Sequence, residues 1–139
     1  MAVSWDEITE GMSVPELKKK PSTQQLVLWA AGSGDFYQIH YDKDFAVGTG
    51  LSNIIVHGAL KNAFLGQFLH DWIGNEGRIK SYGCSYRGMD YPNDEYTCKG
   101  TVTKKYEKDG EKLVDLEIWG ENPEGKKTTP GHATVRIGK

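Results

Sequence analysis

The sequence has little cysteine and no long hydrophobic run. Its 139 residues include two cysteines, Cys84 and Cys98, in none of the short spacings that bind metals or build a disulfide framework. No stretch approaches the roughly 20 apolar residues that a membrane helix needs. The first ten residues are polar and lack the basic start and apolar core of a signal peptide. These absences predict a cytoplasmic protein with no membrane partner.

An excess of charge of one sign is also lacking. The formal net charge is -2, and the one dense basic run is Lys18-Lys19-Lys20. This balance offers no electrostatic footprint for nucleic acid or anionic lipid, so neither is expected as a partner. Repeats, low-complexity tracts and long linkers are absent too, which favours a single domain over residues 1–139.

What is present divides into a helix-rich first half and a strand-rich second half, which is typical of an α+β fold. Helices are predicted at 22–31, ended by Gly32, and at about 58–72, and residues 33–53 are expected to be mostly loop. The second helix has apolar residues around most of its circumference, so we expect it to be buried.

Four later segments alternate apolar and polar residues with the period of two that marks a half-buried strand. Lys-Asp-Gly-Glu at 108–111 and Asn-Pro-Glu-Gly at 122–125 predict hairpin turns and therefore antiparallel pairing. An irregular edge strand is expected at 12–17, because Pro15 removes a hydrogen-bond donor. These patterns favour an antiparallel sheet curled round a buried central helix. The four segments are 79–89, 95–106, 113–119 and 132–137.

Residues able to carry chemistry gather in two short stretches, 32–42 and 54–60. Asp35 and His40 are five residues apart on a glycine-rich loop, where an acid and an imidazole can hold and deprotonate a water. The start of the second helix offers free N–H groups to a developing oxyanion. From these residues alone, a turn-capping Asp35 and a structural His40 are the simpler interpretation, and His57 fits a buried histidine bonded to backbone.

The pattern Gly34-Asp35-x-x-x-Ile39-His40, followed by Ile55-Val56-His57-Gly58, resembles the signature of the MaoC-like, (R)-specific enoyl-CoA hydratases. The resemblance continues through the chain in the order of its elements. It implies the hot-dog fold of that family, in which an antiparallel sheet wraps one long helix.

The resemblance also implies roles for individual residues. Asp35 matches the catalytic acid, His40 the catalytic imidazole, and Gly58 the glycine whose N–H binds the thioester carbonyl; Tyr37 and His57 are further candidates for substrate binding. Tyr37-Gln38 replaces the usual Asn-Pro of the family, a departure that bears on pocket shape and chain-length preference.

The reaction implied is hydration of a trans-2-enoyl-CoA to a 3-hydroxyacyl-CoA, or the reverse dehydration, with no metal or organic cofactor. Asp35 would take a proton from water while His40 orients it. A thioesterase and a non-catalytic partner subunit are the alternatives; the presence of both Asp35 and His40 argues against the second, and their position on a loop before the helix against the first.

A finer resemblance concerns assembly. The stretches Asp71–Gly74 and Ile79–Gly83 are similar to the small MaoC-like subunits of bacterial steroid side-chain degradation, which pair with a second, different chain. Hot-dog subunits pair side by side, so a homodimer or a heteromer with another hot-dog chain is expected. The acyl group, the direction of the reaction, and the choice between CoA and acyl carrier protein are left open.

Overall fold

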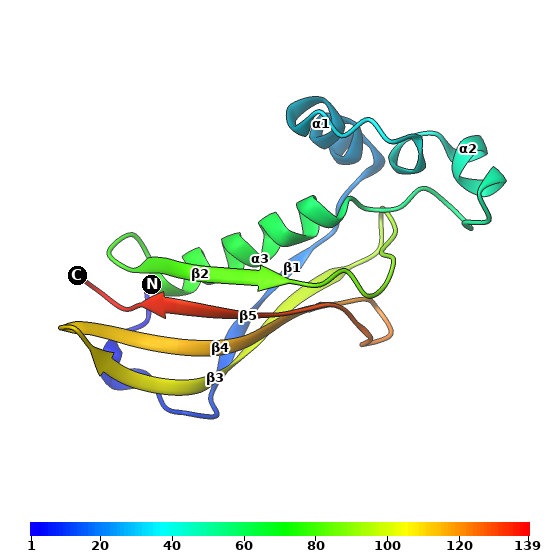
Figure 1. Cartoon of the computed structure of the whole chain (residues 1–139). Coiled ribbons are helices and arrows are strands. Elements are labelled where there is room, and N and C mark those ends of the chain that lie inside the picture. Colours follow the sequence, from blue (N-terminus) through cyan, green and yellow to red (C-terminus); the bar gives the residue numbers. More distant parts are fainter.

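The computed structural model describes residues 1–139. Its elements, in chain order, are η1 (Trp5–Glu7), β1 (Ser13–Lys19), α1 (Thr23–Ser33), η2 (Gln38–His40), α2 (Lys43–Gly48), α3 (Gly58–Ile73), β2 (Arg78–Cys84), β3 (Tyr96–Lys108), β4 (Glu111–Glu121) and β5 (Lys127–Arg136). The strands form one antiparallel sheet in the order β1-β3-β4-β5-β2, and α3 lies across one face of it (Figure 1). This is the predicted arrangement of a sheet around one central helix.

The hairpin turns form as the sequence predicts. Asp109 and Gly110 join β3 to β4 with φ values of 52° and 77°, the positive values that a two-residue turn of this kind requires. Between β4 and β5, the side chain of Asn122 accepts hydrogen bonds from the N–H groups of Glu124 and Lys126. The early strand β1 is an edge strand, as predicted, and its register shifts between Val14 and Leu17, around Pro15.

The core lies between α3 and the face of the sheet turned toward it. Alternate residues of each strand point into it, because successive side chains in a strand face opposite sides. No helix of the structure is both long and apolar enough to span a membrane. The main contributors from α3 are Phe64, Leu65, Phe68, Leu69 and Trp72, and those from the sheet are Tyr96, Cys98, Val102, Val114, Leu116, Ile118, Ala133 and Val135.

The main differences from the sequence prediction lie in three places. The segment 33–53 is not mostly loop: it holds η2 and α2, and α2 begins where the Asp42 carboxylate accepts the N–H of Phe45. The strand predicted to reach residue 89 stops at Cys84, although Ser85 and Arg87 still donate their N–H groups to the main chain at 128–130. The last strand begins at Lys127, earlier than predicted.

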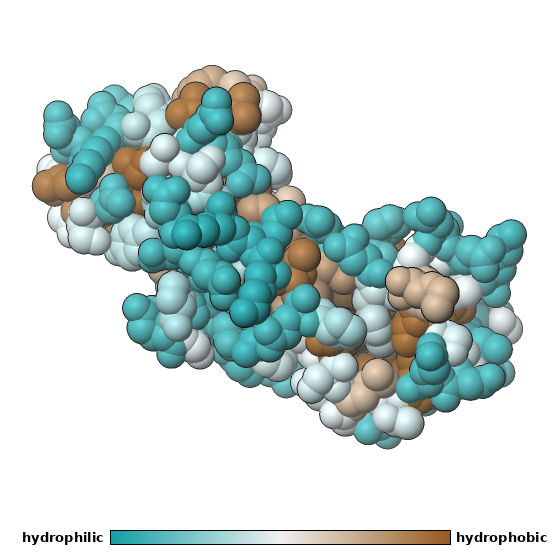
Figure 2. All heavy atoms as spheres, turned by 180° about the vertical axis from the view of Figure 1, so that it is seen from behind, coloured by the Kyte–Doolittle hydropathy of each residue, from teal (hydrophilic) through white to brown (hydrophobic).

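The segment from α1 to α2 projects beyond the amino end of α3 as a lobe, and both chain termini lie at the opposite end of the molecule (Figure 1). Apolar surface shows on the outer parts of this lobe (Figure 2). Neither Trp72 nor Trp119 is among the exposed apolar side chains: Trp72 is buried in the core, and Lys127 lies over the Trp119 ring. The exposed large apolar side chains are instead Val27, Leu28, Phe36, Tyr37, Tyr41, Val47, Tyr86 and Met89, apart from the terminal Met1.

Candidate functional site

The turn after α1 sets the position of Asp35. Helix α1 ends two residues later than predicted, at Ser33 and beyond Gly32. Gly34 follows it with a φ of 78°, a conformation that favours glycine. The Ser33 hydroxyl accepts the Asp35 N–H, and Asp35 Oδ1 accepts the Tyr37 N–H at 3.3 Å. This small turn occupies Oδ1, so Oδ2 is the oxygen that faces His40.

His40 is buried and oriented by the segment that precedes α3. Its Nδ1 lies 2.8 Å from the carbonyl oxygen of Ile55, and the Ile55 N–H donates to the carbonyl of Ile39. Since a carbonyl can only accept, Nδ1 carries the proton of the neutral ring. In the neutral ring, His40 Nε2 is therefore the nitrogen without a proton, and it faces Asp35 Oδ2 across 3.8 Å.

A single water molecule beside the two groups can hydrogen-bond to both. Both facing atoms are acceptors, and water has two O–H groups to donate. A water that donates to both would keep its lone pairs free to bond to an acceptor carbon. Asp35 is exposed over 49% of its side chain and His40 over 9%, so the acid borders solvent while the imidazole does not. The arrangement is able to hold and deprotonate water.

His57 lies behind this pair and is fully buried. Its ring stacks on that of His40, with centroids 3.8 Å apart, and its Nε2 lies 3.3 Å from the main-chain oxygen of Asp35. Burial lowers the pKa of His57 below 6.5, and the neighbouring His40 lowers it further. The remaining nitrogen, Nδ1, has no partner, so protonation would bury an unpaired donor. His57 is the buried, backbone-bonded histidine that the residues suggested.

Gly58 begins α3, and its N–H has no acceptor within the chain, as expected of the first turn of a helix. A cavity of about 310 Å³ connects it with His40. A Cβ at position 58 would lie 2.9 Å from the Tyr86 ring, which makes glycine the fitting residue there. The lining comprises His40, Ile55, Val56, Gly58, Lys61, Tyr86, Arg87, Gly88 and Met89.

The structure separates the sequence-predicted residues into two groups. His40 and Gly58 both line the cavity, and Asp35 lies next to it, facing His40. Tyr37 does not line the cavity: it is half-exposed, and its ring meets that of His40 edge-on with centroids 6.3 Å apart. Residues 86–89 and Lys61, which form a wall of the cavity, were not predicted from the sequence. The one local signal was a lysine inside an otherwise apolar helical stripe.

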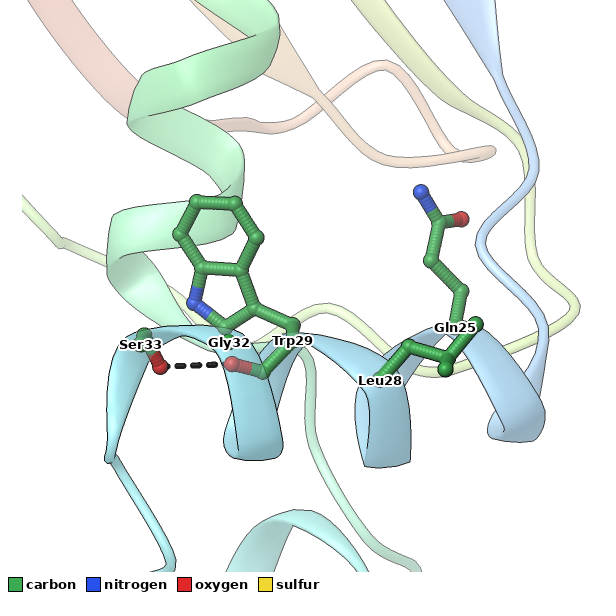
Figure 3. A pocket seen from close by; sticks show the side chains of 5 residues that line it. All are labelled: Gln25, Leu28, Trp29, Gly32 and Ser33. Atoms are coloured by element: carbon green, nitrogen blue, oxygen red, sulfur yellow. Dashed lines mark hydrogen bonds between the residues drawn. The ribbon is translucent and has the colours of Figure 1, made fainter.

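A second hollow, of about 490 Å³, lies beside α1 (Figure 3). Trp29 and Gln25 extend from one side of the helix, and the Ser33 hydroxyl donates to the main-chain oxygen of Trp29. None of the five residues around it titrates near neutral pH, so this hollow offers no group for proton transfer. The five are Gln25, Leu28, Trp29, Gly32 and Ser33.

Asp35, His40 and His57 are also the one group of side chains close enough to hold a metal ion, with ligand atoms within 4.8 Å of one another. The two imidazole rings are stacked and nearly parallel, so their in-plane lone pairs do not converge on one point. His40 Nδ1 and His57 Nε2 are moreover engaged by main-chain oxygens. The arrangement does not fit the tetrahedral geometry usual for zinc.

Comparison with known proteins places the chain in a family. The MaoC-like domain model matches residues 6–118. The chain is 32% identical over 127 residues to the 3-oxo-4,17-pregnadiene-20-carboxyl-CoA hydratase beta subunit of Mycobacterium tuberculosis, covering 91% of this chain and 93% of that protein. The chain belongs to the MaoC-like family of hydratases and dehydratases.

Solved structures agree with this assignment. A chain of the ChsH1-ChsH2 complex from Mycobacterium tuberculosis superposes with a TM-score of 0.80 and 28% identity, over 93% of this chain and 98% of that one. The unliganded R-hydratase PhaJ1 from Pseudomonas aeruginosa gives a TM-score of 0.89 over 99% of this chain and 87% of that one, at 22% identity. The fold is the hot-dog fold predicted from the sequence.

Proposed function

We propose that this chain adds water to the double bond of a trans-2-enoyl-CoA thioester to give a 3-hydroxyacyl-CoA, or catalyses the reverse dehydration. The observation that carries the proposal is the 3.8 Å approach of Asp35 Oδ2 to the unprotonated Nε2 of His40, in contact with a cavity that ends at the free N–H of Gly58. Named hydratases among the relatives support the same reaction class.

The proposed reaction begins with water held between Asp35 and His40. The Asp35 carboxylate accepts one proton, and the water oxygen bonds to the β-carbon of the enoyl group. The electron pair of the double bond moves toward the thioester oxygen, where the Gly58 N–H stabilises the developing negative charge by about 3 kcal/mol. The Asp35–His40 pair then returns a proton to the α-carbon, so atoms and charge balance. The proposal requires no metal or organic cofactor.

Two observations favour a second chain in the working assembly. Asp35 is half-exposed, and the apolar side chains left in solvent lie on the α1–α2 lobe and at residues 86 and 89, close to the cavity. Surplus apolar surface of this kind marks interfaces. The similar protein is a beta subunit, and a similar solved structure is a two-protein complex. We therefore propose pairing with a second hot-dog chain, with a different chain favoured over self-pairing.

The test is an assay of turnover with crotonyl-CoA, using the chain together with any partner that copurifies with it. Asp35→Asn keeps the shape of the side chain and removes the base, while His40→Ala removes the imidazole. Each should lower kcat by at least about 100-fold, and the double variant should lose little more, because the two residues act on one water. His132→Ala, at an exposed histidine, is the matched control. Near-normal turnover in Asp35→Asn would contradict the proposal.

The same assay separates the alternatives. A hydratase removes the absorbance of the enoyl thioester without releasing thiol, whereas a thioesterase releases free CoA, which a thiol reagent detects. A non-catalytic partner subunit would leave turnover of the complex unchanged in both the Asp35 and the His40 variants.

A further inference from the structure

A buried ion pair that the proposed reaction does not use lies in the wall of the cavity. Lys61 is on α3, one turn after Gly58, and is 3% exposed; its Nζ donates to Asp90 Oδ2 at 2.9 Å and to the main-chain oxygen of Gly88 at 3.0 Å. Asp90 is 5% exposed. Burying two charges carries a large desolvation cost, which their attraction offsets only with good geometry and further hydrogen bonds.

Asp90 has those further bonds, and they reach three parts of the fold. Its Oδ2 also accepts the Thr128 hydroxyl at 2.6 Å, at the start of β5. Its main-chain oxygen accepts the N–H of Val56 at 2.8 Å. A single residue thus joins α3, β5 and the segment 54–57 that leads into the proposed oxyanion site.

This junction lies next to the reacting groups on both sides of the cavity. On one side, the segment held through Val56 includes Ile55, whose carbonyl orients His40 at 2.8 Å, and continues into Gly58. On the other side, Lys61 holds the carbonyl of Gly88, in the loop that also carries Tyr86 against Gly58. The ion pair therefore links two walls of the cavity. One wall carries the His40 imidazole, and the other would confine the thioester.

We propose that Lys61 and Asp90 are positioning residues for the hydration site: together they hold His40 and the Gly58 N–H at the separation that the thioester needs. The inference rests on the proposed function for its effect on turnover. A buried ion pair is weak evidence for a stabilising role, since apolar residues of similar volume often replace such pairs with neutral or favourable effect. A positioning role accounts for the pair, because small displacements of the reacting groups lower the rate of the reaction.

The test replaces the pair by apolar side chains in the double variant Lys61→Met/Asp90→Leu. The variant should remain folded and unfold at a temperature close to that of the native protein, whereas each single variant leaves one buried charge alone and should be clearly less stable. Its kcat on crotonyl-CoA should fall by about 10- to 100-fold, with a much smaller change in KM. The matched control is Lys80→Met/Glu111→Leu, which removes a partly exposed ion pair between β2 and β4 and should leave kcat unchanged.

A second measurement reads the positioning without turnover. In the double variant the Val56 amide should exchange with solvent at least about 10-fold faster than in the native protein, while amides in the middle of β4 keep their rates. Unchanged exchange at Val56, or a native kcat in the folded double variant, would overturn the inference. A native protein without hydratase activity would instead refute the proposed function, and the exchange measurement would still decide whether the pair holds this segment.

Discussion

At the scale of single residues, His57 links both proposed catalytic residues. It stacks on the ring of His40 and bonds the main chain of Asp35, so its neutral form is built into the site. Because burial lowers its pKa in the folded protein, the unfolded chain binds this proton first as the pH falls. The stability that His57 contributes is complete above the ordinary histidine pKa of 6.5 and is lost as the pH falls from there through the lowered pKa of the folded state.

A pH series of melting temperatures tests this. Between about pH 7 and about pH 5, the native protein should lose more thermal stability than His57→Phe, which fills the same space with a ring that cannot titrate. His132→Gln, at an exposed position, should retain the native slope. Equal slopes in the native protein and His57→Phe would show that this histidine is not held neutral by the fold.

Gly58 presents a second test at this scale. A methyl group added in Gly58→Ala would lie 2.9 Å from the Tyr86 ring, which must then move into the cavity. We expect a folded protein with kcat lowered about 10-fold or more, because the thioester approaches this same N–H. In the double variant Gly58→Ala/Tyr86→Ala the obstruction is absent, so part of the activity should return. If no activity returns, the loss comes from the start of helix α3 and not from the Tyr86 ring.

At the scale of elements, the space around a glycine decides whether the position tolerates a side chain. Position 120 of β4 faces Tyr96 of β3, and a Cβ there would overlap the phenol oxygen. Tyr96 is buried and donates to Thr129, so it has no free space to enter. In contrast, Gly32 of α1 has open space around its Cβ position.

Urea unfolding of alanine variants at these two glycines compares a crowded position with an open one. Gly120→Ala should lower the free energy of unfolding by at least about 2 kcal/mol through overpacking. Gly32→Ala should raise it by about 0.5–1 kcal/mol, since alanine is the better helix former. A stable Gly120→Ala would mean that Tyr96 can leave the core without loss.

The elements also differ in how far local sequence determined them. The turn at Asp109-Gly110 and the central helix α3 appear where predicted, because turn residues and periodicity act over a few positions. Helix α2 was missed since its amphipathic pattern is short and Asp42 was one of several turn-forming residues. The early end of β2 at Cys84 depends on how the chain meets β5, which periodicity does not encode.

At the scale of the whole molecule, the exposed apolar side chains predict association. Light scattering of the purified material should give a mass above the 15.5 kDa of one chain, corresponding to at least two hot-dog chains. The chain expressed alone is the control. A mass near 15.5 kDa would refute self-pairing, and if that sample also lacked activity, copurification from the native host should bring down a second hot-dog chain together with turnover.

The α+β class, the antiparallel pairing and the motif that includes Asp35, His40 and Gly58 could all be predicted from the amino-acid sequence. Each of these depends on residues within a few positions of one another. Other features depend on contacts between distant residues: the Ile55 carbonyl positions the Nδ1 proton of His40, and Lys61 pairs with Asp90, 29 residues away. Such contacts depend on strand register and on how the loops cross the end of the helix. These are set by the packing of the whole core, so no local pattern predicts them.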